Sequence, residues 1–153
     1  MRYLYVIDLQ HDFVKGADGR YVYAKCLEFI NSHGADYDAI IAPVFIQNPT
    51  ENINFARFID YDGCKVYTPL EFAPDKIIYH SGYTGYVNDL NVDDQVDIIG
   101  FDTDACVLST CFDLFNHNVN FRILSEYCYS SGGKNAHRAG LAIMKRQFGK
   151  ALN

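Results

Sequence analysis

The chain has 153 residues, of which 49% are apolar and 21% charged, and this is the composition of an ordinary globular protein. We expect residues 1–153 to form a single domain. The 13 Lys and Arg are outnumbered by 19 Asp and Glu, for a net charge of −6. This balance excludes the concentrated basic face that nucleic-acid binding needs. The amino-terminal stretch MRYLYVIDLQ is too short for a targeting signal, and no apolar run reaches about 18 residues, so we expect a cytoplasmic protein with no membrane partner.

Short apolar segments rich in β-branched and aromatic residues alternate with segments of helical periodicity. The predicted strands are 3–8, 39–46, 77–80, 95–101 and 120–126, and the predicted helices are 22–34, 104–118 and 135–149. The strands are apolar almost throughout, which is typical of strands covered on both faces. This alternation predicts an α/β fold, a doubly wound and mainly parallel sheet with helices on both faces.

Two glycines and one irregular segment complete the pattern. Gly34 and Gly149 stand where carboxyl-terminal helix caps belong. Residues 47–75 contain three prolines and one short helical candidate, at 52–59. We expect this segment to cross over the sheet without forming a second domain.

Polar residues that end the predicted strands are the first candidates for a site, because parallel sheets bind ligands at the carboxyl ends of their strands. Asp8 ends the first strand, His80 ends the third, and the turn from Phe101 to Cys106 follows the fourth. A buried Asp8 costs free energy unless it is paired. It is therefore either a functional group or a cap of the following turn.

The stretch GFDTDACVLST at 100–110 contains one of five cysteines. Cys106 falls in the first turn of a predicted helix, after possible capping residues at 102–104. The helix dipole there is expected to lower the pKa of the thiol and favour the thiolate. The alternative is that Cys106 is a small core residue, which is how we interpret Cys111 on the same helix.

Four blocks, in order, resemble the isochorismatase-like cysteine hydrolases, a family that includes nicotinamidases and related amidohydrolases. DLQHDF, from Asp8, is similar to the family pattern D-x-Q-x-D-F, and GFDTDACV to G-x-x-T-D-x-C-V. YHSGYTGYVNDL at 79–90 resembles K-x-x-Y-S-x-F, and SEYCYSSGG, followed by His137 and Leu141, resembles the family's last loop and helix. The resemblance covers nearly the whole chain.

The resemblance implies the chemistry of a covalent hydrolase. Cys106 would attack a carbonyl carbon, and Asp8 would take the thiol proton and return it to the leaving group. A cis peptide bond between Phe101 and Asp102 is implied as well. The backbone N–H groups of Asp102 and Cys106 would then form the oxyanion hole.

One residue departs from the family pattern, because His80 stands where the family carries its catalytic lysine. Lys76 lies four residues earlier on the same strand, roughly 13 Å away, and is a poor substitute. An imidazolium beside Asp8 would be favoured, and a Cys–His–Asp group is a workable nucleophile system. The alternative is a neutral His80 in a site that has lost activity.

The sequence offers no ligand set for a metal or a cofactor. The segment FIQNPTENINFARF after the second strand contains no histidine, unlike metal-binding nicotinamidases, and the first strand is not followed by G-x-G-x-x-G. We therefore expect no metal and no other cofactor.

The expected function is hydrolysis of a C–N bond in a small amide through a covalent Cys106 intermediate, without a metal. The alternative is a catalytically impaired homologue that binds a small molecule or a protein partner.

Either function could use aromatic residues near the strand ends to bind the ligand; the candidates are Phe13, Phe45, Phe55, Tyr83 and Tyr86. Residues 130–133 are either part of the pocket mouth or a flexible turn. The aromatic-rich composition and the family resemblance predict a homodimer or a higher homo-oligomer.

Overall fold

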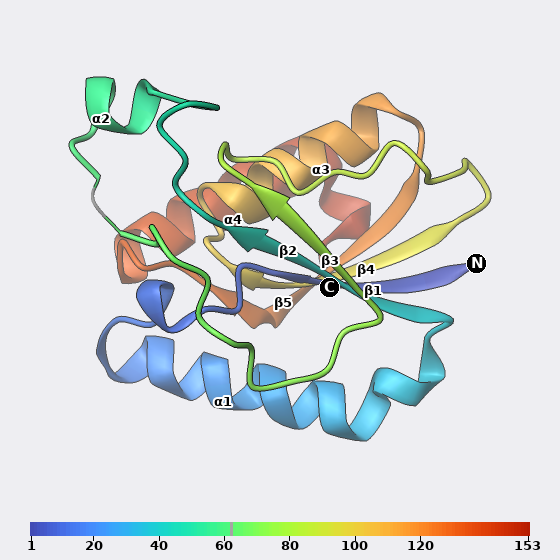
Figure 1. Cartoon of the computed structure of the whole chain (residues 1–153). Coiled ribbons are helices and arrows are strands. Elements are labelled where there is room, and N and C mark those ends of the chain that lie inside the picture. Colours follow the sequence, from blue (N-terminus) through green and yellow to red (C-terminus); the bar gives the residue numbers. More distant parts are fainter. Residues whose placement is uncertain (62) are drawn as a thin grey trace.

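The computed structural model describes residues 1–61 and 63–153. In this part of the chain, five strands form one parallel sheet in the order β3-β2-β1-β4-β5 (Figure 1). They are β1 (Arg2–Ile7), β2 (Ala39–Phe45), β3 (Lys76–His80), β4 (Gln95–Phe101) and β5 (Asn120–Tyr129). The predicted doubly wound parallel sheet is confirmed.

Helices cover both faces of this sheet. They are α1 (Gly16–His33), α3 (Cys106–Asn116) and α4 (Lys134–Phe148), and a further helix, α2 (Asn54–Phe58), belongs to the irregular segment after β2. Figure 1 shows α1 on one face and α3 and α4 on the other. Successive side chains of a strand point to opposite faces, so Leu4 and Val6 pack in the cluster that includes α1, while Tyr5 and Ile7 pack with residues of α3 and α4. Burial on both faces explains the uninterrupted apolar strands. None of the described helices has the length and hydropathy needed to cross a bilayer.

The helix boundaries differ from the predictions mainly at the amino-terminal ends. α1 begins at Gly16, well before residue 22, because Gly16 adopts a φ of 70° that starts the helix directly after the preceding loop. Gly34 and Gly149 are carboxyl-terminal caps, as predicted, although both are right-handed and lead into short 3-10 turns. α2 and α3 lie within their predicted segments, and α4 begins one residue before its predicted start at 135.

The irregular segment after β2 contributes an aromatic layer near the carboxyl ends of the strands. Its helix α2 lies beyond the ends of β2 and β3 in Figure 1. Phe55 of α2 and Cys64 pack against Phe45 at the end of β2, with Phe13 and Tyr61 at the edge of this cluster. The segment therefore forms a wall over one side of the sheet's carboxyl edge.

The strand order fixes where a ligand crevice can form. From β1 the chain winds outward through β2 and β3, and then it returns to pair β4 on the other side of β1 and continues to β5. The direction of winding reverses between β1 and β4, and such switch points open a crevice at the carboxyl ends of the strands. Asp8 and Asp102 directly follow these two strands.

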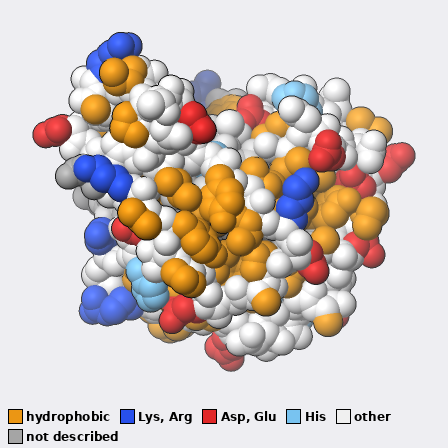
Figure 2. All heavy atoms as spheres, in the orientation of Figure 1, with side chains coloured by type: hydrophobic (Ala, Val, Ile, Leu, Met, Phe, Trp, Pro, Cys, Tyr) orange, Lys and Arg blue, Asp and Glu red, His pale blue; other side chains and the backbone are white. Residues whose placement is uncertain are grey.

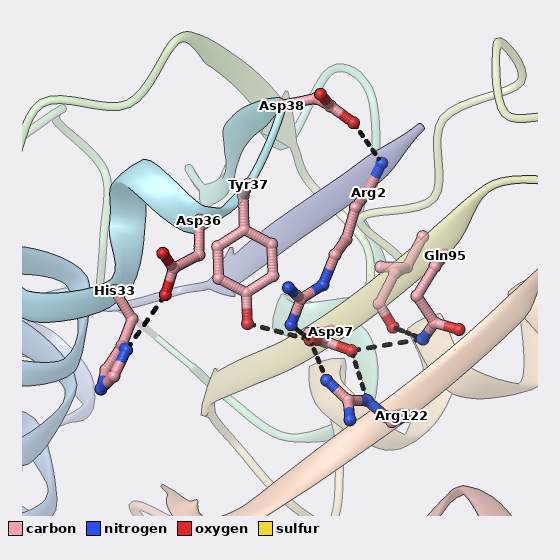
Figure 3. A network of polar contacts seen from close by, with 9 residues as sticks. Arg2, His33, Asp36, Tyr37, Asp38, Gln95, Asp97 and Arg122 are labelled. Atoms are coloured by element: carbon pink, nitrogen blue, oxygen red, sulfur yellow. Dashed lines mark hydrogen bonds and ion pairs between the residues drawn. The ribbon is translucent and has the colours of Figure 1, made fainter.

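At the opposite end of the sheet, Asp97 of β4 is fully buried in a network of polar contacts (Figure 3). Arg122 donates to its two oxygens at 2.8 and 2.5 Å, Arg2 at 3.1 Å, Tyr37 at 2.9 Å and Gln95 at 3.2 Å. Burial alone would raise the pKa of Asp97, but the hydrogen bonds from Arg122, Tyr37 and Arg2 hold it below its usual value. The network ties β1, β4 and β5 together.

Candidate active site

Asp8 lies at the switch point between β1 and β4, with its backbone fixed by both neighbouring strands. Its φ is 46°, and its N–H donates to the carbonyl oxygen of Pro43 at 3.0 Å. On the other side, a Cβ at Gly100 would lie only 2.0 Å from the carbonyl oxygen of Ile7. This close approach of β4 leaves Asp8 fully buried at the base of the crevice.

His80 ends β3, and its imidazole lies between two oxygen acceptors. Nε2 is 2.7 Å from Asp8 Oδ1, and Nδ1 is 2.9 Å from the carbonyl oxygen of Gly82. A neutral imidazole has one N–H, so both nitrogens donate together only when the ring is protonated. Burial alone would lower the pKa of His80, but the charge of Asp8 and the hydrogen bonds to Asp8 and Gly82 outweigh it and raise the pKa. The raised pKa favours the protonated imidazole, which forms a buried ion pair with Asp8.

The second carboxylate oxygen of Asp8 has a different environment. Oδ2 is buried, and no described residue donates a hydrogen bond to it. An unsatisfied buried acceptor costs about 1–3 kcal/mol, and it calls for an explanation in a native protein. This oxygen is free to accept a proton from a group that enters the crevice.

Cys106 is the first residue of α3 and is only 6% exposed. Burial raises the pKa of its thiol well above the usual value, and the negative charge of Asp8, a side-chain hydrogen bond with Asp8 and the charges of Asp102 and Asp104 raise it further. The predicted lowering of this pKa is therefore wrong, because carboxylates gathered from two loops outweigh the dipole at the end of one helix. Cys106 is a neutral thiol at rest, and it needs a base to become a nucleophile.

The turn between β4 and α3 has an unusual backbone. The peptide bond between Phe101 and Asp102 is cis, as the family resemblance implies. Among the described residues, none accepts a hydrogen bond from the backbone N–H of Asp102 or of Cys106. Their role as an oxyanion hole remains a prediction.

The acidic side chains of this turn do not cap α3, contrary to the prediction. Asp102 accepts the backbone N–H of Ser131 at 2.7 Å and the Ser131 hydroxyl at 2.5 Å, and Asp104 accepts the hydroxyl of Ser130 at 2.5 Å. α3 has no side-chain cap. The acids instead fasten the turn to the loop between β5 and α4. Burial, opposed in part by the hydrogen bonds from Ser131, raises the pKa of Asp102 to about 6.

A cavity of about 230 Å³ opens beside Cys106. It is smaller than the roughly 300–1,000 Å³ typical of drug-sized ligand sites, so it suits a small ligand. Half of its lining residues are aromatic, and one carries a carboxylate. The lining residues are Phe13, Phe45, Phe55, Ile59, Tyr61, Tyr83, Asp102, Ala105, Cys106 and Ser131.

The cavity brings together four of the five aromatic candidates, since Tyr86 is not part of its lining. The ring of Tyr86 stacks on His117 instead, 4.2 Å between centroids. The sequence prediction missed Ile59 and Tyr61. Both lie in the irregular segment after β2, where no periodic pattern indicates which side chains face inward. Within the described chain, His80 bonds to Asp8 but forms no hydrogen bond with Cys106.

Comparison of the sequence with known protein families identifies the family of this chain. The sequence model of the isochorismatase domain matches residues 76–153, just over half of the chain. The chain belongs to the isochorismatase domain family. The matched part begins with β3 and includes His80 and the turn that leads to Cys106. No curated protein matches the chain in sequence.

Solved structures extend the isochorismatase fold to the whole chain. The nicotinamidase from Bacillus subtilis matches with a TM-score of 0.76 and 18% identity, over 99% of this chain and 98% of that one. The pyrazinamidase/nicotinamidase from Streptococcus mutans UA159 matches with a TM-score of 0.76 and 16% identity, over 100% of both chains. At these identities the likeness establishes the fold alone.

The described residues of the site form no cluster of metal ligands. The pyrazinamidase of Pyrococcus horikoshii, solved in complex with zinc, matches with a TM-score of 0.72 and 20% identity, over 99% of this chain and 97% of that one. In the described part of the present chain, no three His, Cys, Asp or Glu side chains gather so that they could hold a metal ion. The segment after β2, which walls the cavity, has no histidine.

Proposed function

We propose that residues 1–153 form a single hydrolase domain that cleaves the C–N bond of a small amide through a covalent Cys106 intermediate, without a metal. The observation that carries this proposal is the combination of a neutral, buried thiol with the unpartnered oxygen Oδ2 of Asp8. A base with a free lone pair beside a thiol that must lose its proton is the arrangement that covalent catalysis requires. The fold shared with nicotinamidases supports an amide as the substrate.

The reaction runs in two halves. Asp8 takes the thiol proton while Cys106 Sγ attacks the amide carbon, and the N–H groups of Asp102 and Cys106 stabilise the oxyanion. The tetrahedral intermediate collapses, the C–N bond breaks, and Asp8 passes its proton to the departing amine. A water molecule, deprotonated by Asp8, then attacks the thioester and releases the acid and the thiol.

His80 contributes charge and position in this scheme. Its imidazolium balances the negative charge of Asp8 in a crevice that also holds Asp102 and Asp104. Lys76 does not take this role, because its ammonium lies 3.5 Å from Asp89, near the start of β3. The positive charge at residue 80 is therefore lost when the imidazolium is deprotonated at high pH.

The decisive experiment measures ammonia release from a panel of small primary amides, nicotinamide included. We expect turnover by the wild type and none by Cys106→Ala. Cys111→Ala is the matched control, because Cys111 is a buried thiol on the same helix that does not line the cavity. Equal activity of Cys106→Ala and Cys111→Ala would overturn the assignment of the nucleophile.

Limited alkylation gives an independent test of the same thiol. All five cysteines are free and buried, and Cys106 is the one that lines the cavity. Mass mapping after brief treatment with iodoacetamide should find Cys106 modified first, since Asp8 can remove its proton. Preferential labelling of Cys26, Cys64 or Cys111 in the folded protein would contradict the proposal.

A second function is a catalytically impaired homologue that binds a small molecule or a protein partner. The raised pKa of Cys106 and the presence of His80 in place of a permanent cation favour it. Binding of an amide without ammonia release, in both the wild type and His80→Lys, would establish this alternative.

The proposal also includes a homodimer or a higher homo-oligomer. β3 is an edge strand of the sheet, and its Tyr79 is 56% exposed and packs edge-on against Tyr67. Figure 2 shows apolar side chains gathered over the middle of the face that the view presents. Light scattering during size exclusion should give at least twice the chain mass, and a monomer at micromolar concentration would contradict this part.

A further inference from the structure

The cavity beside Cys106 is an aromatic enclosure whose rings support one another. Phe45 is packed edge-on against Phe13, Phe55 and Tyr61, with centroids 6.1, 5.1 and 6.0 Å away, and Phe55 lies 5.2 Å from Tyr83. Such mutual packing holds the rings in place before a ligand enters. The faces of aromatic rings carry negative potential and attract cations.

Asp102 adds a formal negative charge to this aromatic wall. Its only described hydrogen-bond donor is Ser131, which gives one hydrogen bond to each oxygen. A carboxylate has about four acceptor positions, so each oxygen of Asp102 can accept another hydrogen bond. Of the described residues that line the cavity, none is Lys or Arg. Nothing on this wall therefore neutralises Asp102.

Other carboxylates make the surroundings still more negative. Asp104 and Asp8 add to burial in raising the pKa of Asp102 to about 6, so Asp102 is mostly ionised at neutral pH and shares its region with two further acids. The imidazolium of His80 is already paired with Asp8. A ligand that brings its own positive charge would restore the balance, and one that brings a carboxylate would worsen it.

We propose that the cavity selects amides whose remaining part is a small cation, such as a pyridinium or alkyl ammonium group, and that Asp102 is the residue that determines this specificity. The inference rests on the proposed amide hydrolysis, because it names the substrate class of the same site. The cation would lie among the aromatic rings and against Asp102, with its carboxamide carbon at Cys106. Neutral amides of the same shape bind less well, and anionic ones bind worst.

The test compares three carboxamides built on one six-membered ring: 1-methylnicotinamide, a cation; nicotinamide, which is neutral; and 3-carbamoylbenzoate, an anion. Binding is measured by calorimetry on the full chain carrying Cys106→Ala, so that hydrolysis does not interfere. We expect the cation to bind about 10-fold more tightly than the neutral amide, with the anion weakest. Equal affinity for the three compounds would overturn the proposal.

Two further variants test whether Asp102 causes the preference for the cationic amide. Asp102→Asn keeps the shape and removes the charge, and it should bring the ratio of cation to neutral affinity close to one. Asp104→Asn is the matched control, because this acid bonds to Ser130 and does not line the cavity, so most of the preference should remain. Melting temperatures verify that both variants fold. A preference unchanged in Asp102→Asn contradicts the role of this residue.

The two proposals fail in different ways. Preferential binding of the cation with no ammonia release from any amide would leave this inference standing and remove the hydrolase. Ammonia release at equal kcat/KM from the cationic and neutral amides, unaffected by Asp102→Asn, would retain the hydrolase and remove the inference.

Discussion

Two fully buried aspartates on neighbouring central strands, Asp8 after β1 and Asp97 in β4, have opposite environments. Asp97 receives five hydrogen bonds from four side chains, two of them arginines (Figure 3). Asp8 has one charged side-chain partner, His80, and it also interacts with the neutral thiol of Cys106. The sheet thus holds a carboxylate with many hydrogen-bond donors at its amino-terminal end and one with few donors at its carboxyl end.

The difference separates a structural charge from a chemical one. A carboxylate surrounded by guanidinium groups is stabilised as an anion and becomes a poor base, which the lowered pKa of Asp97 reflects. A carboxylate with a free lone pair and one titrating partner retains the ability to take a proton. Burial alone does not distinguish the two, but the number and permanence of the partner charges do.

The largest expected effect is on turnover when Asp8 loses its basicity. Asp8→Asn should lower kcat/KM by about 10²–10⁴, because positioned general bases contribute this much. Steady-state ammonia release measures it. Asp97→Asn serves as the control and should retain kcat at temperatures where it is folded. Comparable losses of turnover in the two variants would erase the functional distinction between the acids.

The next effect is on stability, and it belongs to Asp97. Removing one partner of a buried ion pair costs about 3–5 kcal/mol, and we expect the lower end for Asp97→Asn because both guanidinium groups reach solvent. Urea unfolding measures the change. The lowered pKa means that the contribution of Asp97 is complete above its unfolded value, near 3.9, and is lost as pH falls through the folded pKa.

The acid limb of the stability profile checks the origin of this change. The unfolding free energy of the wild type should fall at acid pH more steeply than that of Asp97→Asn, which has no carboxylate to protonate. Parallel profiles would show that packing, and not the charge network, accounts for the loss.

Replacing His80 should affect turnover somewhat less than replacing Asp8. His80→Ala is expected to cost about 10²–10³ in kcat/KM, as the loss of a stabilising charge in a dry site does. His80→Lys should retain activity, because it restores a cation. Full activity of His80→Ala would exclude the residue from the mechanism.

The pH profile distinguishes the two cations at residue 80. The pKa of His80 is raised, so the ion pair with Asp8 is complete below the unfolded value, near 6.5, and is lost as pH rises through the folded pKa. Wild-type turnover should fall over that range, while His80→Lys should remain active to higher pH. Coinciding alkaline limbs would contradict a catalytic imidazolium.

The smallest expected effect is that of a chelator. Dialysis against EDTA should leave turnover and the melting temperature unchanged, because the described residues offer no cluster of metal ligands. A loss of activity restored by zinc or manganese would show that a metal neutralises Asp8 together with His80.

The fold could be predicted because local signals and tertiary structure agree. Strands β1 and β2 are apolar on both faces, and this pattern has one common explanation, a parallel sheet that is covered on both sides. The amino-terminal end of α1 was predicted too late because glycines at 16 and 19 indicate a turn. Asp97, in QVDIIGF, is a visible anomaly, but its partners at residues 2, 37 and 122 lie far away in sequence.

The site was predicted less well than the fold, because its electrostatics depend on residues that are far apart in sequence. Asp8, His80 and Cys106 could be named because each stands at a strand end or a helix start. The pKa of Cys106 depends on carboxylates from separate elements, so the local helix dipole gave the wrong sign. The capping roles of Asp102 and Asp104 failed because serines from the loop after β5 take their oxygens.

Gly100 sets a limit on how this protein can vary. With φ at 122° and the Ile7 carbonyl oxygen 2.0 Å from where a Cβ would stand, even alanine has no room there. A library selected only for folded expression should therefore keep glycine at 100, while at 102 it should accept asparagine, whose side-chain oxygen can still accept a hydrogen bond from Ser131. Selection for growth on a single amide as nitrogen source would then constrain 102 as well. Positions 100 and 102 would then respond to different selections, the first for the fold and the second for the substrate.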